Sequence, residues 1–442
     1  MHLKNIESAL ILPLLLSCPT ANVCAQVEKC DTVFLTVEQL FDRGTSQNLH
    51  LAADRLKEQM AEERRRTART SRLPDISIGL KGGILGQPVV FQKGLSSPTY
   101  PETPDWQQNY AVDVTQPIYE GGRIRYSIKQ ADMEKDIALL QTASDRADIK
   151  LALLNSYLSL FTLYSQRRVL TRNIEESERR LTDIRHMKKE GLITNNDVLR
   201  SEMQLTDNRL VLEETCNDIR IASQRLDVIL GIEENLIILP DSSLLDQTCS
   251  VSTYDEYVSM AYTSDPSMLL LQKQTELADN EIRMAKAEML PKMSLTASNA
   301  LARPITRTMA DMYNNSWNIA LSITYPLSSI YKSRHRIKEA RHNLNLMVNA
   351  EEQKRQNIRT DVKEAMLKHS EALKRTEALK LTVKQAEENY RIMHNRYLNQ
   401  MAILTDLLDA DNLRLNAQLK LTQARTDAIY TYYRLQRAVG NL

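Results

Sequence analysis

Residues that could catalyse a reaction or hold a metal ion are scattered along this sequence. The seven histidines form no cluster, and His335 and His342 have the seven-residue spacing of one exposed helix face. The sequence contains no nucleophile elbow, no phosphate-binding loop and no cysteine pair at zinc-site spacing. We therefore predict that the protein is not an enzyme and has no catalytic residue, no cofactor site and no metal site.

The cysteines leave two alternatives open. Five are present, and an odd number would remain after removal of an N-terminal leader ending at Ala25. Cys30 and Cys249 each lie shortly before the first helix expected in one half of the chain. In an oxidising compartment they could form a bridge, and two free thiols are the other interpretation.

The elements that would have to position such residues are mostly helical. The 442 residues include only 11 glycines and 13 prolines, and 26% of the residues are charged. Basic and acidic residues number 57 and 56, so the chain lacks the basic field of a typical nucleic-acid-binding protein. A mean hydropathy of −0.40 excludes a helical membrane protein with several spans.

The N-terminus is typical of an exported protein. An apolar stretch over residues 9–16 is followed by small and polar residues, which predicts a signal peptide over 1–25. Cleavage before an acylated Cys18 is a second interpretation, and a buried first helix is a third. The apolar stretch is too short for a transmembrane helix.

An internal repeat dictates the architecture. From Pro117 to Gly231 and from Pro326 to Gly440 the spacing is 114 residues in each case, so the copies align without a gap at an offset of 209. We place the first repeat at 26–239 and the second at 240–442. The first copy is eight residues longer upstream, in an expected loop around 86–105.

Long helices must dominate each copy. No glycine or proline occurs in the 68 residues between Gly122 and Gly191, and a helix of that length would run roughly 100 Å. Such helices are stable in water only when they pack lengthwise. An apolar heptad stripe and a parallel stripe of small residues mark the expected seam: Val198, Leu205, Leu212, Ile219 and Leu226, and in the second copy Ala410, Ala417 and Ala424.

Between the paired prolines the hydrophobic period changes to two, which indicates strands. We predict four, near 75–85, 108–117, 292–301 and 316–326. About ten residues is the length of a strand that crosses an outer membrane. Aromatic residues near the strand ends fit a membrane interface, although a soluble hairpin would look similar: Trp106, Tyr110, Trp317 and Tyr325.

Four strands cannot close a barrel, and open sheet edges do not persist in lipid. If the strands cross a membrane, the protein must therefore form oligomers. A dimer with eight strands and a trimer with 12 are the smallest alternatives, and the strand count does not choose between them.

In this order and spacing, three motifs make the chain similar to the outer membrane efflux protein family, the TolC-like channels. They are residues 116–123 (QPIYEGGR) after a strand, 190–193 (EGLI) before Asp197, and the segment 397–410. The resemblance implies a mainly α fold with a small β part. In it, duplicated helical hairpins form an α-barrel tunnel, and a homotrimer builds a 12-stranded transmembrane β-barrel.

The resemblance also implies a function and a place in the cell. The protein would be the outer-membrane channel of a tripartite efflux or type I secretion system, extending into the periplasm. Its expected partners are a periplasmic adaptor, an inner-membrane pump and outer-membrane lipid, without cofactor or nucleic acid. The alternative from another class is an exported coiled-coil scaffold or adaptor without a membrane barrel.

Carried over from the family motif, Asp406 and Asp409 would ring the periplasmic entrance, where six carboxylates in a trimer would favour cations. The alternatives are a helix cap for Asp406 and a solvated charge for Asp409. Asp197 and Tyr397 match positions that hold neighbouring hairpins closed in the family. Ala402 replaces a basic residue of that closing network, and Gln400 replaces the glycine of the turn.

Overall fold

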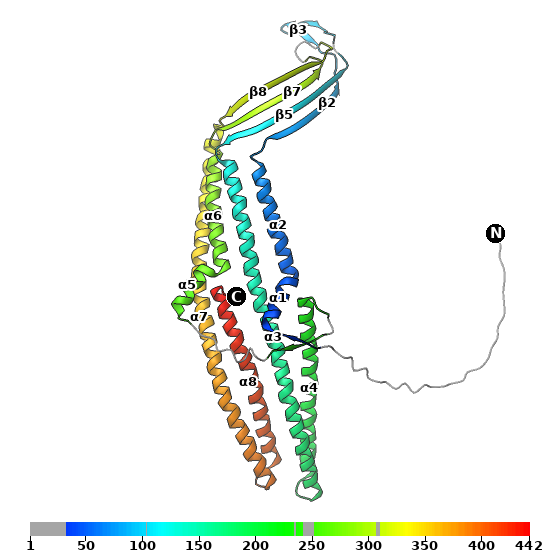
Figure 1. Cartoon of the computed structure of the whole chain (residues 1–442), viewed down its shortest axis with the longest axis vertical. Coiled ribbons are helices and arrows are strands. Elements are labelled where there is room, and N and C mark those ends of the chain that lie inside the picture. Colours follow the sequence, from blue (N-terminus) through cyan, green and yellow to red (C-terminus); the bar gives the residue numbers. More distant parts are fainter. Residues whose placement is uncertain (1–31, 103, 234–235, 242–251, 306–309) are drawn as a thin grey trace, which may run out of the picture.

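The computed structural model is an elongated molecule with helices running lengthwise and its main sheet at one end (Figure 1). The structure describes residues 32–102, 104–233, 236–241, 252–305 and 310–442. The expected signal peptide over 1–25, with Cys18, and the pair Cys30 and Cys249 lie outside these residues.

Eight helices and eight strands are described. The helices are α1 (Val37–Gln47), α2 (Leu49–Thr70), α3 (Arg123–Lys189), α4 (Asn195–Leu230), α5 (Tyr254–Ser264), α6 (Pro266–Ala287), α7 (Ser328–Leu398) and α8 (Leu404–Val439). The strands are β1 (Thr32–Leu35), β2 (Asp75–Ile84), β3 (Val90–Lys93), β4 (Ser96–Thr99), β5 (Trp106–Glu120), β6 (Ile237–Pro240), β7 (Lys292–Arg303) and β8 (Asn314–Thr324). The expected mainly α fold with a small β part is confirmed.

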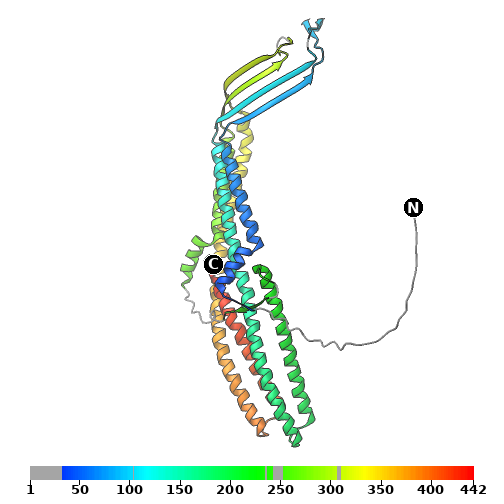
Figure 2. The ribbon, with the colours of Figure 1, turned by 45° about the vertical axis from the view of Figure 1, so that its right-hand side comes forward.

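Helices α3 and α7 run the length of the helical part, with 67 and 71 residues. At 1.5 Å per residue, α7 is about 107 Å long. Helices α2 and α6 flank them on the side of the sheet, and α4 and α8 flank them at the opposite end (Figures 1 and 2). We call that opposite end, formed by the α3–α4 turn (190–194) and the α7–α8 turn (399–403), the tip. Among the described residues, no helix is apolar enough over a sufficient length to cross a membrane.

The helix bounds follow the sequence repeat. Helices α4 and α8 each contain 36 residues, and their first residues, Asn195 and Leu404, differ in number by the repeat offset. Both helices end at a glycine with positive φ, 63° at Gly231 and 84° at Gly440. A left-handed residue at this position satisfies the last helical carbonyls, and glycine adopts it without a steric penalty.

A second glycine position joins the sheet to the helices. Gly121, between β5 and α3, has a φ of 64°, and a Cβ built there would lie 2.4 Å from the backbone oxygen of Ala287 at the end of α6. Only glycine allows this close approach. The turn therefore fixes α3 beside α6 directly below the sheet.

The middle of the molecule is held by a small parallel sheet of β1 and β6 and an apolar cluster around it. Tyr157 of α3 is fully buried in this cluster, and its hydroxyl donates to the Leu35 carbonyl at 2.6 Å and accepts from the Asp241 amide at 2.7 Å. Burial raises the pKa of Tyr157 to about 12, so the hydroxyl stays protonated. The strands are thus tied to the long helix.

The main sheet has the antiparallel order β2–β5–β7–β8, so its two central strands come from different repeats. Strand β5 extends to Glu120, past the expected end at Pro117, because the ladder shifts register between Pro117 and Tyr119. A bulge accommodates proline, which has no N–H to donate. The loop expected around 86–105 contains the short hairpin of β3 and β4.

The register places apolar side chains on one face of the main sheet. Ile78 pairs with Val112, Val114 with Ala297, and Leu295 with Leu321. The alternate residues of the same strands are mostly small or polar. This apolar face comprises Ile76, Ile78, Leu80, Ile84, Trp106, Tyr110, Val112, Val114, Met293, Leu295, Ala297, Leu301, Trp317, Ile319, Leu321 and Ile323.

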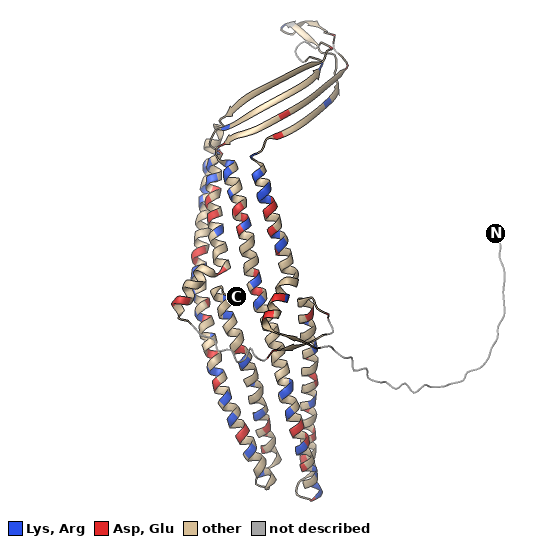
Figure 3. Ribbon diagram, in the orientation of Figure 1, with Lys and Arg blue, Asp and Glu red and all other residues tan. Residues whose placement is uncertain are grey.

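Nothing in the described chain covers this face. Ile78 and Leu80 are each 74% exposed, and Ile319 is 66% exposed. Strand β8 contains no charged residue, and Figure 3 shows few charges on the sheet against many along the helices. An exposed apolar surface this continuous marks a contact with lipid or protein.

The helical hairpin α3–α4 is joined to the hairpin α7–α8 by a buried polar network. Asp411 of α8 accepts from Arg180 of α3 at 2.8 Å, from Asn173 at 3.2 Å and from Arg414 at 2.8 Å. Side chains of Arg180 and Asp411 are only 5% and 4% exposed. Asn208 of α4 donates to Asn173 at 2.8 Å, and the Arg414 guanidinium lies 3.9 Å from the Tyr390 ring centroid of α7. All four helices therefore share one network.

We predict that Asp411→Ala destabilises the protein by about 3–5 kcal/mol, because it leaves Arg180 and Arg414 buried without their shared carboxylate. Thermal unfolding of the detergent-solubilised protein, followed by circular dichroism, measures the loss. The control is Glu178→Ala, which removes an exposed ion pair to Arg209 at 2.5 Å and should cost less than about 1 kcal/mol. Equal unfolding midpoints for the two variants would contradict the assignment.

Candidate functional site

The first turn of the tip is closed by standard capping interactions. Gly191 has a φ of 75°, and the Leu192 amide donates to the Met187 carbonyl at 2.9 Å. Helix α4 then begins with a capping box, in which the Asp197 carboxylate accepts from the Thr194 amide at 2.9 Å and from its hydroxyl at 2.7 Å. This turn is therefore held by its own residues.

The second turn keeps the equivalent backbone hydrogen bond, from the Met401 amide to the Arg396 carbonyl at 2.8 Å, but it has neither the glycine nor the side-chain cap. Gln400, at the position equivalent to Gly191, has a φ of 58°, which costs a non-glycine residue about 1–2 kcal/mol. Ile403 occupies the N-cap position of α8, equivalent to Thr194, and has no side chain that can cap the helix. The α7–α8 turn is thus less stabilised by local interactions than the α3–α4 turn.

The structure places Asp406 and Asp409 on the exposed surface of the first turns of α8. Asp406 is equivalent to the capping residue Asp197, but it forms no capping box, and Ile403 has no hydroxyl that could take part in one. Its negative charge still interacts favourably with the N-terminus of α8. Both carboxylates therefore face solvent at the tip of the single chain.

Asp197 and Tyr397 come from different hairpins and lie near each other without a hydrogen bond. Tyr397 is 95% buried in an apolar cluster with Val198, Leu404 and Leu407, and its hydroxyl has no hydrogen-bond partner in the described part of the chain. The pKa of Tyr397 is raised first by burial and then by the negative charge of Asp197. The Asp197 carboxylate is used instead by Thr194.

A basic residue that the sequence analysis did not single out connects the two hairpins. Arg200 of α4 donates from Nη1 to the Thr405 hydroxyl of α8 at 2.9 Å. Ala402, where a basic residue was expected from the family pattern, lies only three residues before Thr405. The link joins the α3–α4 hairpin to the α7–α8 hairpin of the same chain, with the guanidinium supplied by the first hairpin. Arginines are common along these helices, so no local signal in the sequence marks this one.

The aromatic residues lie at both ends of the apolar face. Trp106 begins β5, and Tyr110 and Trp317 lie near the same end of the sheet, away from the helices. Tyr325 directly follows β8 at the helical end. From Trp317 to Tyr325 the strand rises about 26 Å at about 3.3 Å per residue. All four are exposed.

Comparison with known proteins identifies the family. The profile of the outer membrane efflux protein family matches residues 40–232 and 257–441. Outer membrane protein TolC of Escherichia coli (strain K12) is 23% identical over 353 residues, covering 75% of this chain and 69% of that protein.

Solved structures agree with this match. A structure of CusC superposes with a TM-score of 0.79 at 16% identity, covering 92% of this chain and 93% of that one. The outer membrane protein VceC of Vibrio cholerae superposes with a TM-score of 0.75 at 17% identity, covering 91% of this chain and 96% of that one. The resemblance seen in the sequence motifs is confirmed, as are the predicted location and the absence of enzymatic function. The chain belongs to the outer membrane efflux protein family, whose members are outer-membrane channels that extend into the periplasm and are not enzymes.

Proposed function

We propose that the protein is the passive exit duct of a tripartite efflux or type I secretion system, acting as a homotrimer. In this trimer the four-stranded sheets of three chains close a 12-stranded barrel in the outer membrane, and the long helices form a periplasmic tunnel. The proposed partners are a periplasmic adaptor and an inner-membrane pump, which supplies the energy. The signal peptide over 1–25 and the two repeats, 26–239 and 240–442, belong to the same proposal.

One observation carries the proposal: a largely exposed apolar face on a sheet whose two outer strands, β2 and β8, each have a single neighbour in the described chain. Lipid would cover the apolar face, since about 26 Å along a strand tilted by about 35–45° spans roughly 20 Å of an outer-membrane apolar band that is about 25 Å tall. Because β2 and β8 run in opposite directions, β8 of one chain can pair antiparallel with β2 of the next.

The surface of α7 supports the association of several chains. Between Ser333 and Ile358 this helix has no buried residue in the single chain, and Leu346 and Val348 are 60% and 51% exposed. A long helix with this much exposed apolar surface requires a neighbour. Sister chains would supply it along the tunnel wall.

The alternative of a coiled-coil scaffold without a membrane barrel is less well supported, because it gives the apolar face of the sheet no partner. A conductance measurement distinguishes the duct from the scaffold. Purified protein in a planar lipid bilayer should conduct ions if it is a duct. Folded protein that never conducts and is recovered in the soluble periplasmic fraction would favour the scaffold.

We expect Asp406→Asn with Asp409→Asn to weaken cation selectivity and to raise the concentration of multivalent cation needed for half block by about tenfold or more. In a trimer the pair removes six negative charges from one constriction, which reduces its attraction for cations. Single-channel recordings with asymmetric salt measure both effects. The control, Glu213→Gln with Glu214→Gln, makes the same charge change on the exposed surface of α4, away from the tip. Unchanged selectivity in the Asp406 and Asp409 variant would exclude the proposed ring.

Closure of the tip is a separate proposal. We expect Arg200→Ala to increase the single-channel conductance severalfold, since it removes the hydrogen bond to Thr405 that joins the two hairpins. Arg209→Ala is the matched control, because Arg209 lies on the same helix but pairs with Glu178 inside its own hairpin. Adding Ala402→Arg to Arg200→Ala should lower the conductance again by restoring a cation between the hairpins. If Arg200→Ala conducts like the wild type, the tip is held closed by other contacts.

A further inference from the structure

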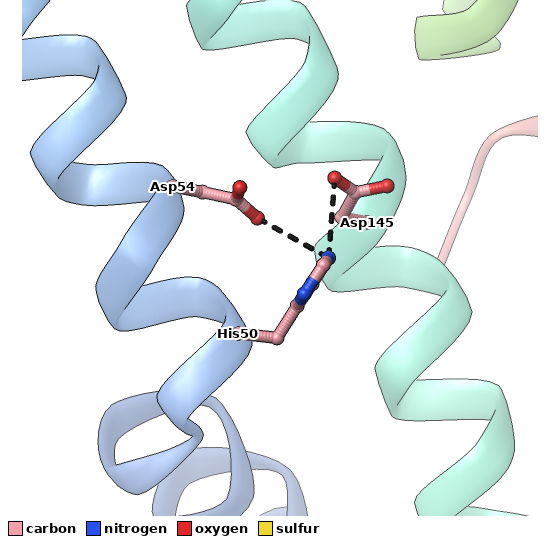
Figure 4. Close-up of side chains that lie close together, drawn as sticks. All are labelled: His50, Asp54 and Asp145. Carbon is pink, nitrogen blue, oxygen red and sulfur yellow. Dashed lines mark ion pairs between the residues drawn. The ribbon is translucent and has the colours of Figure 1, made fainter.

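Away from the tip and the sheet, one histidine and two carboxylates converge between α2 and α3 (Figure 4). Nε2 of His50 lies 3.7 Å from Oδ2 of Asp54 and 3.7 Å from Oδ2 of Asp145. All three potential ligand atoms lie within 4.8 Å of one another. Figure 4 shows the imidazole of His50 directed between the two carboxylates.

Local structure fixes these side chains. The Asn48 side chain caps α2 and accepts from the His50 amide at 2.8 Å, which sets the first turn of the helix. His50 and Asp54 are four residues apart and share one helix face. Asp145 projects toward them from α3 (Figure 4). The cluster therefore spans two helices that are far apart in sequence.

Asp54 is the unusual member. Its side chain is only 2% exposed, and Lys57 donates to its Oδ1 at 2.9 Å. Oδ2 is buried, has no hydrogen-bond partner among the residues that the structure describes, and faces His50. A buried carboxylate oxygen without a partner is costly, because it has lost water and gained no donor. This orphaned oxygen indicates that the cluster takes a further positive group.

The charges around the cluster favour a cation. The pKa of Lys57 is raised by its hydrogen bond to Asp54 and by the charges of Asp54 and Asp145. The Lys57 ammonium can stay on Oδ1 and orient the carboxylate, which leaves Oδ2 as the free ligand atom. His50 is 61% exposed, so an ion would reach the site from solvent and could keep a water ligand.

We propose that His50, Asp54 and Asp145 bind a divalent transition-metal ion of the Zn²⁺ class and thereby cross-link α2 to α3. Imidazole nitrogen with carboxylate oxygen is a donor set suited to such ions, whereas Mg²⁺ and Ca²⁺ prefer oxygen alone. Tetrahedral ligands of zinc lie about 3.4 Å from one another, given bond lengths of about 2.0–2.2 Å. The two 3.7 Å distances in the cluster require only small side-chain movements to reach that geometry.

Zn²⁺ binding to the purified full-length protein tests the proposal. After treatment with a chelator and its removal, calorimetric titration should give one high-affinity Zn²⁺ per chain. His50→Ala and Asp145→Asn should each weaken this binding at least tenfold. Neither change empties a buried position, and circular dichroism verifies that each variant folds. His342→Ala is the matched control, because it removes an exposed histidine of α7 and should bind Zn²⁺ like the wild type.

A second readout is independent of affinity and of transport. Co²⁺ added to the wild type should give the visible absorption of a tetrahedral nitrogen and oxygen site, and His50→Ala should abolish it. The proposal is overturned if the wild type binds Zn²⁺ no more tightly than His50→Ala does, or if His342→Ala removes the binding. Neither result bears on the proposed duct, since the cluster lies outside the tip and the sheet.

Discussion

The surface of the main sheet is the constraint on which the rest of the molecule depends. Sixteen residues of one face are apolar and most of them are exposed, and the outer strands β2 and β8 present backbone groups to solvent. A single chain can neither cover this apolar face in water nor pair the backbone groups of its edge strands in lipid. In the proposed trimer, association of chains would resolve both at once, because edge pairing would use the backbone groups while curvature would turn the apolar face outward. The long helices, fixed below the sheet at turns such as that of Gly121, would then associate as well.

The sequence repeat explains why the two hairpins are alike and where they differ. Gly191 and Thr194 make the α3–α4 turn locally self-sufficient, whereas Gln400 and Ile403 leave the α7–α8 turn with backbone strain and no side-chain cap. Folding alone does not require the α7–α8 turn to be less stabilised by local interactions than the α3–α4 turn. A turn that must move relative to its neighbour tolerates weak local interactions, so the asymmetry fits a tip at which the second hairpin is the part that moves.

Much of the architecture could be predicted because it depends on patterns among residues that are close in sequence. The absence of glycine and proline marks α3 and α7, and the change to a period of two marks the four strands of the sheet. Contacts between distant residues could not be predicted in this way. Arg180 and Asp411 look like ordinary charges on helical surfaces until α3 and α8 bring them together in a buried pair. Likewise His50 and Asp145 have no spacing that indicates a metal site, and the family motif pointed to Ala402 while the connecting guanidinium is that of Arg200.

The order in which the two hairpins could separate follows from the strengths of their links. The Arg200–Thr405 hydrogen bond is exposed, and such a bond contributes about 0.5–1.5 kcal/mol or slightly more because one partner is charged. Breaking the buried Arg180–Asp411 pair would cost about 3–5 kcal/mol. In the proposed opening, separation would begin at the Arg200–Thr405 link, would have to break the apolar contacts around Tyr397, and would stop at Asp411. From the start of α8 at Leu404 to Asp411 the helix rises roughly 10 Å, so the proposed opening would involve only this short end of the second hairpin and the turn before it.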